Sequence, residues 1–174
     1  EIFISEKLQK LNKSKLKPWV HFGLTSEDIN NISYSMMWKD GIKNVYLDKL
    51  NAVIKAIKSL TSKHSKDAIL SLTHGQPATP TTFGKEMAVF YNRLNKHYKK
   101  LKELELEGKI SGATGTWAAH VCAYPEIDWL RFSKRLVKSF GLKHNPLTTQ
   151  VESHDSLAEQ YHLLSRVNSV LIDF

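Results

Sequence analysis

The strongest constraint on the fold is an unbroken repeat of apolar residues between positions 83 and 104. The repeat alternates steps of four and three, which places one continuous stripe on a single helix face. That spacing specifies near-parallel packing against neighbouring helices, as in helical bundles. The single polar member, His97, is more often a packed, hydrogen-bonded histidine than a catalytic group in such a position. The stripe consists of Phe83, Met87, Phe90, Leu94, His97, Leu101 and Leu104.

A second long helix is predicted to follow Thr25. Thr25 and Asp28 stand at the spacing of a capping box, so the helix should begin there and run to about Ser62. Gly41 is its weakest point and a candidate bend. Residues 1–12 also have helical composition. The buried face of the long helix is expected to hold Tyr46, Leu50, Val53, Ile57 and Leu60.

The remaining chain predicts further helices. One is expected to begin at Pro80, because proline favours the first helical position. Residues 125–140 predict a shorter helix ended by Gly141. From Ser153 onward the pattern is apolar on more than one face, so that helix should be central. We find no convincing strand pattern, and the sequence predicts an all-α fold, an elongated bundle of long helices.

Residues 108–115 form a glycine-spaced break between helices. No strand is predicted before it and no Gly-Lys-Ser/Thr closes it, so it matches no phosphate-binding loop. We expect it to be a place where two backbones approach closely.

Composition narrows the choice of partners. The formal charge is +8, and four of the 25 basic residues are arginines. Arginine forks and aromatic platforms, on which nucleic-acid binding relies, are not clustered, so a polyanionic small substrate fits better than nucleic acid. No apolar run approaches the ~18 residues of a membrane span. Cys122 is the only cysteine, so there is no internal disulfide framework, and we expect a reducing, cytoplasmic location.

The ends of the chain suggest that more protein belongs with it. The sequence starts at Glu1 and stops at Phe174 within an apolar helical pattern. We therefore expect it to be a segment of a longer protein.

Two polar loops next to predicted helix ends carry candidate chemical groups. In the first, His21 precedes Thr25 and Ser26 at a helix start, where free N–H groups favour an anion. Glu27 and Asp28 already offset the helix dipole there, so the two hydroxyls are as consistent with a plain cap. The second runs over residues 73–82, where two prolines stiffen the loop and His74 and Gln76 could act as donors.

A third polar loop contains Thr148, Thr149, Gln150 and His154. Taken singly, each of the three loops is as consistent with an ordinary surface loop. They could form one site only if the helices lie side by side or if several chains contribute.

Longer strings in these loops resemble a known family. They are His21-Phe-Gly-Leu-Thr-Ser-Glu-Asp-Ile-Asn-Asn, Thr73-His-Gly-Gln-Pro-Ala-Thr-Pro-Thr-Thr-Phe-Gly-Lys-Glu-Met-Ala and Asn145-Pro-Leu-Thr-Thr-Gln-Val-Glu-Ser-His-Asp. Together with Gly108-Lys-Ile-Ser-Gly-Ala-Thr-Gly and Ala123-Tyr-Pro-Glu-Ile-Asp-Trp they resemble the adenylosuccinate lyase family of the fumarase/aspartase superfamily. Gly75 favours this purine branch, because fumarase and aspartase typically show Thr-His-Leu-Gln at the second string.

The resemblance implies both an architecture and an activity. Residues 1–24 would be the tail of an N-terminal helical domain, and residues 25–174 an incomplete central helical bundle. The activity would be β-elimination of fumarate from adenylosuccinate, giving AMP, and from succinylaminoimidazole carboxamide ribotide. It would use no cofactor and no metal ion, in a homotetramer whose active sites draw on three subunits.

The resemblance also implies roles for individual residues. His74 would be the general acid that protonates the leaving amine, since amines leave poorly unprotonated. Thr25 and Ser26 would bind a succinyl carboxylate, where donors must stabilise an enediolate. The remaining substrate-binding positions would be Gln150, Thr73 and His21.

Part of the family's machinery has no counterpart in these 174 residues. The signature loop Ser-Ser-x-Met-Pro-x-Lys-x-Asn, which supplies the serine base and a lysine, is not matched, nor are the distal phosphate-binding arginines. We therefore expect the segment alone to be inactive. Two alternatives stay open: another fumarate-releasing lyase, such as argininosuccinate lyase, and a non-catalytic bundle that serves as a scaffold or binds polyanions.

Overall fold

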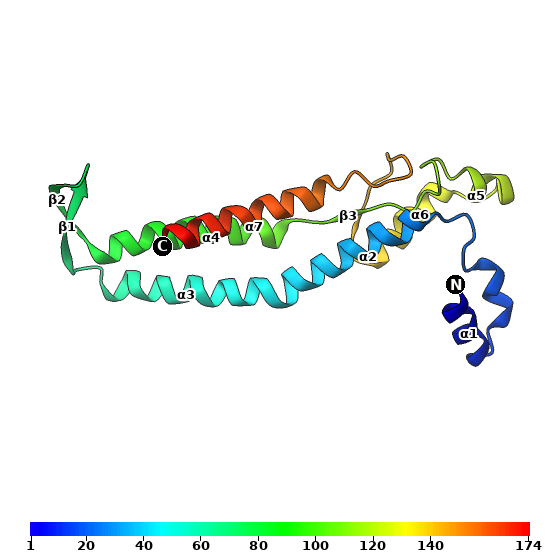
Figure 1. Cartoon of the computed structure of the whole chain (residues 1–174), viewed down its shortest axis with the longest axis horizontal. Coiled ribbons are helices and arrows are strands. Elements are labelled where there is room, and N and C mark those ends of the chain that lie inside the picture. Colours follow the sequence, from blue (N-terminus) through cyan, green and yellow to red (C-terminus); the bar gives the residue numbers. More distant parts are fainter. The chain divides into compact units, whose positions relative to one another are not determined.

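The computed structural model describes residues 1–174 and contains seven α-helices, which confirms the predicted all-α class (Figure 1). The chain forms two compact units. One comprises residues 1–38 with 105–155, and the other residues 39–104 with 156–174. None of the helices combines the length and apolar character needed to cross a membrane.

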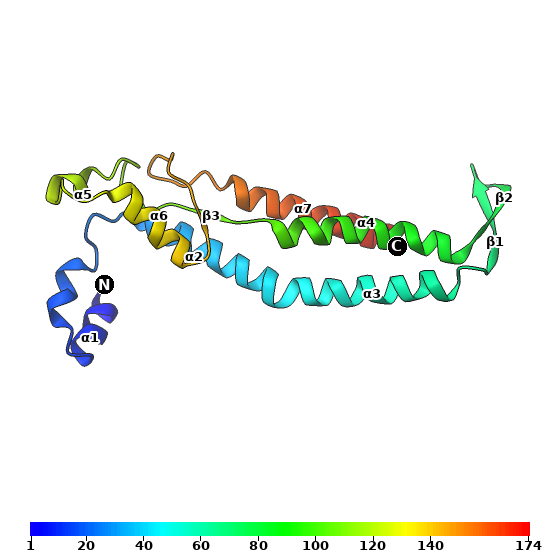
Figure 2. The same cartoon turned by 180° about the vertical axis from the view of Figure 1, so that it is seen from behind.

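The unit of residues 39–104 and 156–174 is built on three helices: α3 (Leu47–Lys63), α4 (Phe83–Glu103) and α7 (Asp155–Asp173). Figures 1 and 2 both show them side by side. At the C-terminal end of α7 the rings of Phe90 and Phe174 pack edge to face at 5.2 Å, and Arg93 pairs with Asp173 at 2.7 Å. The core of this unit consists of Ile42, Leu47, Leu50, Ile54, Ile57, Leu94, Leu101, Leu163, Val167 and Val170.

The long helix predicted after Thr25 is confirmed in its start and its length. It comprises α2 (Ser26–Gly41), a π-helical turn η2 (Ile42–Tyr46) and α3, which ends at Lys63. The change of hydrogen bonding directly follows Gly41, the predicted weak point. A π-helical turn shifts the phase of the buried face, because it adds a residue to the turn.

The predicted buried face of this helix is confirmed at Leu50 and Ile57, whereas the buried position between them is Ile54. The buried residues Ile42 and Leu47 are five positions apart across the π-helical turn, and α3 then buries Leu50, Ile54 and Ile57. The expectation that Val53 is buried was wrong, since its side chain is 40% exposed.

A β-hairpin replaces the predicted start of a helix at Pro80. Strands β1 (Ala68–Thr73) and β2 (Gln76–Thr82) pair antiparallel, and α4 begins only at Phe83, where the Thr82 hydroxyl accepts from the Lys85 N–H. The connecting residues His74 and Gly75 have φ of 53° and 72°, the left-handed conformation that two-residue hairpin turns require.

Proline is tolerated in this hairpin because both strands are edges, where a missing N–H need not break a ladder. Pro80 lies opposite Leu70 and Pro77 opposite Leu72, with an irregularity between the two positions. The expectation that the sequence contains no strand was therefore wrong for residues 68–82.

The unit of residues 1–38 and 105–155 contains more loop. Its helices are α1 (Ile2–Lys10), the 3₁₀ helix η1 (Ser14–Trp19), most of α2, α5 (Ala118–Ala123) and α6 (Trp129–Ser139). Short strands β3 (Glu107–Gly108) and β4 (Lys143–His144) pair in parallel. The core consists of Ile32, Leu106, Ile110, Trp129, Val137 and Leu142.

The ends of α6 show where local sequence was informative and where it was not. The helix stops before Gly141, whose φ is 70°, as predicted. It starts at Trp129 rather than near Pro125, because the Asp128 carboxylate caps the helix by accepting from the Arg131 N–H at 2.9 Å.

The expected close approach of backbones in residues 108–115 is confirmed. A Cβ on Gly108 would lie 2.5 Å from Cδ1 of Ile32, and one on Gly115 would overlap the carbonyl oxygen of Thr148. Glycine is therefore required at Gly115, which meets backbone and has a φ of 77°, whereas the neighbour of Gly108 is the flexible end of a side chain.

Candidate functional site

The candidate site is built on the first turn of α2. The Thr25 N–H donates to Oδ2 of Asp28 at 3.0 Å, and the Asp28 N–H donates to the Thr25 carbonyl at 3.1 Å. This is the cap that the sequence predicted. Unlike an ordinary helix cap, however, the Asp28 side chain has no exposed surface.

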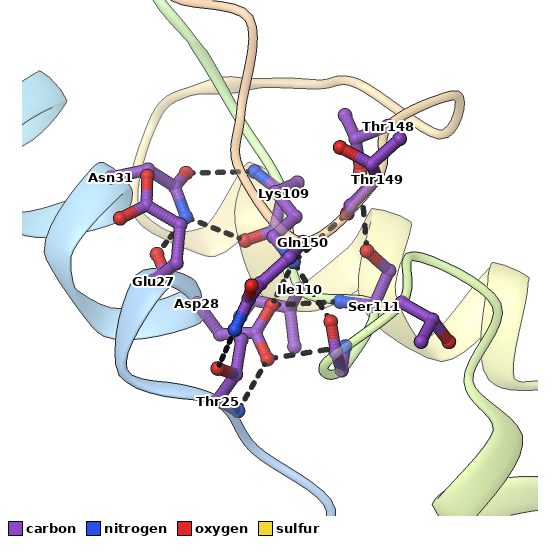
Figure 3. A network of polar contacts seen from close by, with 12 residues as sticks. Thr25, Glu27, Asp28, Asn31, Lys109, Ile110, Ser111, Thr148, Thr149 and Gln150 are labelled. Carbon is purple, nitrogen blue, oxygen red and sulfur yellow. Dashed lines mark hydrogen bonds and ion pairs between the residues drawn. The ribbon is translucent and has the colours of Figure 1, made fainter.

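Asp28 binds a second segment as well as its own helix end. Its carboxylate accepts from the N–H groups of Ser111 at 3.0 Å and Gly112 at 3.1 Å, and Nζ of Lys109 lies 3.0 Å from its Oδ1 (Figure 3). Three backbone donors and one ammonium group therefore surround this carboxylate, which satisfies a buried charge.

Lys109 is equally buried and makes contacts in three directions. Besides Asp28, its ammonium group donates to the carbonyl oxygens of Gly112 at 3.0 Å and Thr149 at 3.5 Å. Asn31 holds the backbone of Lys109 from both sides, accepting its N–H at 2.9 Å and donating to its carbonyl at 3.1 Å. The 109–112 segment is thus fixed against α2.

The third predicted loop meets the first one at this place. Nε2 of Gln150 donates to Oγ1 of Thr25 at 3.4 Å, and the hydroxyls of Thr148 and Ser111 lie 3.3 Å apart. Residues 147–149 and 151–154 also line an open hollow. Of the predicted site residues, the structure therefore brings together Thr25 and Gln150, with Ser26 as the first residue of α2.

Glu27 and Asp28, the two acids at this helix start, each lie close to a basic side chain, and the partner of Glu27 is His154. Its Nε2 lies 3.5 Å from Oε1 of Glu27, and its Nδ1 lies 3.5 Å from Oε2 of the buried Glu152. Glu27 thus faces an imidazole, and Asp28 is neutralised by Lys109. The charge of Asp28 is therefore paired inside the protein, which reduces its repulsion of a bound carboxylate.

The other predicted site residues lie elsewhere. His21 is largely exposed, and its Nδ1 bonds Oε1 of Glu1, a contact that lowers the pKa of that carboxyl. Thr73 and His74 are exposed at the turn of the β1–β2 hairpin, in the unit of residues 39–104 and 156–174.

An apolar cavity of about 400 Å³ adjoins the loop before α2. Aromatic rings surround the buried His120, whose ring centre lies 4.8 Å from that of Trp129 and 5.6 Å from that of Phe22. Burial lowers the pKa of His120, against the opposing effect of the Asp28 carboxylate. The cavity is lined by Trp19, Phe22, Leu24, Ile110, His120, Ile127, Trp129, Phe132 and Leu136.

Sequence reasoning missed the residues that hold the site together: Asp28, Asn31, Lys109 and Ser111. Asp28 was interpreted only as a cap residue. The one local indication for Lys109 is that it is the single charged residue in the glycine-spaced stretch of residues 108–115. Its burial follows from contacts with residues 28 and 149, which no local pattern contains.

Comparisons with known proteins agree with the fold. Adenylosuccinate lyase of Buchnera aphidicola subsp. Acyrthosiphon pisum is 47% identical over 175 aligned residues, and that of Escherichia coli strain K12 is 44% identical. Both alignments cover 100% of this chain but 38% of the relative, so the chain spans well under half the length of these relatives.

Solved structures of similar fold include a fumarate lyase from Mesorhizobium sp. BNC1, with a TM-score of 0.70 and 26% identity over 87% of this chain and 35% of that one. A 3-carboxy-cis,cis-muconate lactonizing enzyme from Pseudomonas putida has a TM-score of 0.74 at 24% identity, over 90% of this chain and 35% of that one, which concerns the fold alone. The sequence model of the lyase family matches residues 1–174. Because that match includes every residue, the chain belongs to the lyase family.

Proposed function

We propose that the full-length protein is an adenylosuccinate lyase, which eliminates fumarate from adenylosuccinate and from succinylaminoimidazole carboxamide ribotide. The observation that carries the proposal is the 41–47% identity of the entire chain to relatives of that name. The geometry supports it, because a hydroxyl and an amide meet at a helix N-terminus, where a carboxylate is favoured.

In this proposal Thr25, Ser26 and Gln150 bind one carboxylate of the succinyl group. The reaction removes a proton from a weakly acidic carbon next to that carboxylate, and donors that strengthen toward the enediolate lower the barrier. The pairing of Asp28 with Lys109 compensates the charge of the buried acid beneath these donors. A site of this kind needs no metal ion and no cofactor.

His74 supplies the proton for the leaving amine, with Thr73 beside it and His21 near the substrate. The exposed position of His74 on a two-residue turn suits a proton donor that acts in a site completed by other chains. This is the motive for proposing a homotetramer with shared active sites. The serine base and the phosphate-binding arginines are expected in parts of the protein beyond these residues, in a cytoplasmic enzyme.

The domain boundary is part of the same proposal. Residues 1–24 would be the tail of an N-terminal domain and residues 25–174 part of the central bundle. Limited proteolysis of the full-length protein tests this boundary: cleavage should concentrate around residues 11–25, between α1 and α2, and sparing of this stretch contradicts it.

The activity is tested by following fumarate release by the full-length protein from adenylosuccinate, succinylaminoimidazole carboxamide ribotide and argininosuccinate. Release from the first two and not the third is the expected result. Release from argininosuccinate alone would favour the other lyase. Absence of turnover on all three, with retention on heparin that AMP does not reverse, would favour a scaffold that binds polyanions.

A further inference from the structure

The charges of Asp28 and Lys109 are costly to bury, and the structure satisfies them completely. Both side chains have no exposed surface. Two apolar side chains of similar size would fill the same space, and such replacements of buried ion pairs are often neutral or stabilising. Packing alone therefore does not explain the two charges, and their contribution lies in the backbone groups that they bind.

The carboxylate of Asp28 binds backbone N–H groups of two separate parts of the chain. Oδ2 of Asp28 accepts from Thr25 and Gly112, and Oδ1 accepts from Ser111. These bonds set the start of α2 against residues 111–112. The loop that carries Gln150 has no bond to Asp28.

Lys109 provides the connection to that loop. Its ammonium group spans from Oδ1 of Asp28, at 3.0 Å, to the carbonyl of Thr149, at 3.5 Å, and Thr149 directly precedes Gln150 (Figure 3). The bond from Gln150 to Thr25 is 3.4 Å long, about the length of the Lys109–Thr149 contact, so the position of the loop depends on both of these long contacts together with the 3.3 Å contact between the hydroxyls of Ser111 and Thr148.

We propose that Asp28 and Lys109 are a positioning pair for dicarboxylate binding: Lys109, anchored on Asp28, holds the carbonyl of Thr149 and so sets the distance between the donors of Gln150 and Thr25. The proposal rests on the proposed function, since it assumes that these donors bind the substrate's carboxylate. Lys109 is buried and neutralised, so it acts through Gln150 and does not touch substrate.

The test uses the full-length enzyme and the inhibition constants of its two products, fumarate and AMP. Lys109→Met is expected to raise the inhibition constant of fumarate by about 10- to 100-fold, the effect of losing one hydrogen bond to a charged group, while that of AMP stays unchanged. Because Lys109 acts through Gln150, Lys109→Met combined with Gln150→Ala should be no worse than the more damaging single variant. Lys143→Met, which removes the lysine of the exposed Lys143–Glu107 ion pair, is the matched control.

A second variant separates positioning from stability. Asp28→Asn with Lys109→Met removes both charges, so it should recover part of the thermal stability lost in Lys109→Met alone, since an amide offers one acceptor oxygen to the three backbone N–H groups where the carboxylate offers two. Fumarate affinity should stay low, because the contact to Thr149 is still absent. If Lys109→Met does not fold, the inhibition constant of fumarate is measured on this double variant instead.

Three results would overturn the proposal. Recovery of stability and fumarate affinity together would make the pair merely structural. An equal loss of affinity for fumarate and for AMP in Lys109→Met would have the same meaning, as would additive effects of Lys109→Met and Gln150→Ala on fumarate affinity. If Thr25→Ala and Gln150→Ala leave fumarate inhibition unchanged, the assigned carboxylate site fails together with the positioning role, whereas a loss in those two but none in Lys109→Met removes the positioning role alone.

Discussion

The imidazole of His120 occupies the space that a side chain on Gly23 would need. A Cβ built on Gly23 would lie 2.6 Å from both Cε1 and Nε2 of His120, and Gly23 has a φ of 66°. The loop that leads into Thr25 therefore packs directly against the aromatic cluster. Its path depends on a glycine for both steric and conformational reasons.

Gly23→Ala is expected to destabilise the protein by about 1–3 kcal/mol, since it combines a steric clash with a left-handed backbone. It should also raise the inhibition constant of fumarate, because the loop before Thr25 must move. Gly41→Ala is the matched control: a Cβ there meets nothing within 4 Å, and its φ of −59° is helical. Urea unfolding should find Gly41→Ala as stable as the parent or more so, and equal loss in both variants would contradict this account.

Three histidines whose pKa values are lowered predict a stability that falls in mild acid. Burial lowers the pKa of His120 below its ordinary value of 6.5, as it does for His97 and His144. The unfolded chain therefore binds more protons between the folded pKa and about 6.5. The free energy that the neutral histidines contribute to folding is fully present above pH 6.5, and it is lost as the pH falls toward the pKa of each histidine in the folded protein.

His120→Phe should flatten the dependence of the unfolding free energy on pH between 7.5 and 5.5, because it keeps an aromatic ring but removes the titrating group. His162→Gln, which removes an exposed histidine, is the control. An unchanged slope in His120→Phe would show that His120 does not contribute to it.

His74→Ala in the full-length enzyme is expected to lower turnover by about 10²–10⁴-fold, with a much smaller change in KM, because a general acid acts in the transition state. His97→Ala is the comparison: the buried Nδ1 of His97 has no hydrogen-bond partner within the chain, so this variant should alter stability or assembly and not the chemical step. Near-normal turnover of His74→Ala would remove His74 from the mechanism.

Substitutions at Leu94 and Leu72 distinguish the packing of the unit's core from contacts between chains. The side chain of Leu94 is fully buried, so Leu94→Ala should lower the unfolding free energy by about 2–5 kcal/mol. The side chain of Leu72 on β1 is 63% exposed. Apolar side chains near the end of α7 are exposed as well, and that of Ile172 is 84% exposed. If these surfaces lie between subunits, Leu72→Lys should weaken association with little effect on the unit's own stability.

Light scattering and urea unfolding of both variants distinguish the two effects. A full-length protein that is monomeric by light scattering would contradict the proposed tetramer, whatever the variants do.

The 174-residue segment alone should not release fumarate, because the general base is expected in another part of the protein. Refolded together with full-length His74→Ala subunits, it could supply His74 to a shared site and restore some activity. Fumarate release by the segment alone would contradict the missing base. Mixed oligomers that stay inactive would contradict shared sites or the role of His74.

Local sequence determined the features whose cause is local. The capping pair Thr25 and Asp28 set the start of α2, and Gly141 set the end of α6, because each depends on residues within one turn. The stripe on α4 identified a bundle, and its members Leu94 and Leu101 are buried as periodicity requires. Motif strings likewise identified Thr25 and Gln150, which the structure brings into contact.

Tertiary structure decided what depends on distant residues. His74 and Gly75 adopt a turn because strands 68–73 and 76–82 pair across them, so the expected helix start at Pro80 was lost to a hairpin. The π-helical turn after Gly41 places the buried residues Ile42 and Leu47 five positions apart, a step that a pattern of threes and fours does not contain. Asp28 and Lys109 are neutralised only because residues 28, 109 and 149 meet, and the burial of a charge is a property of that meeting and not of any one segment.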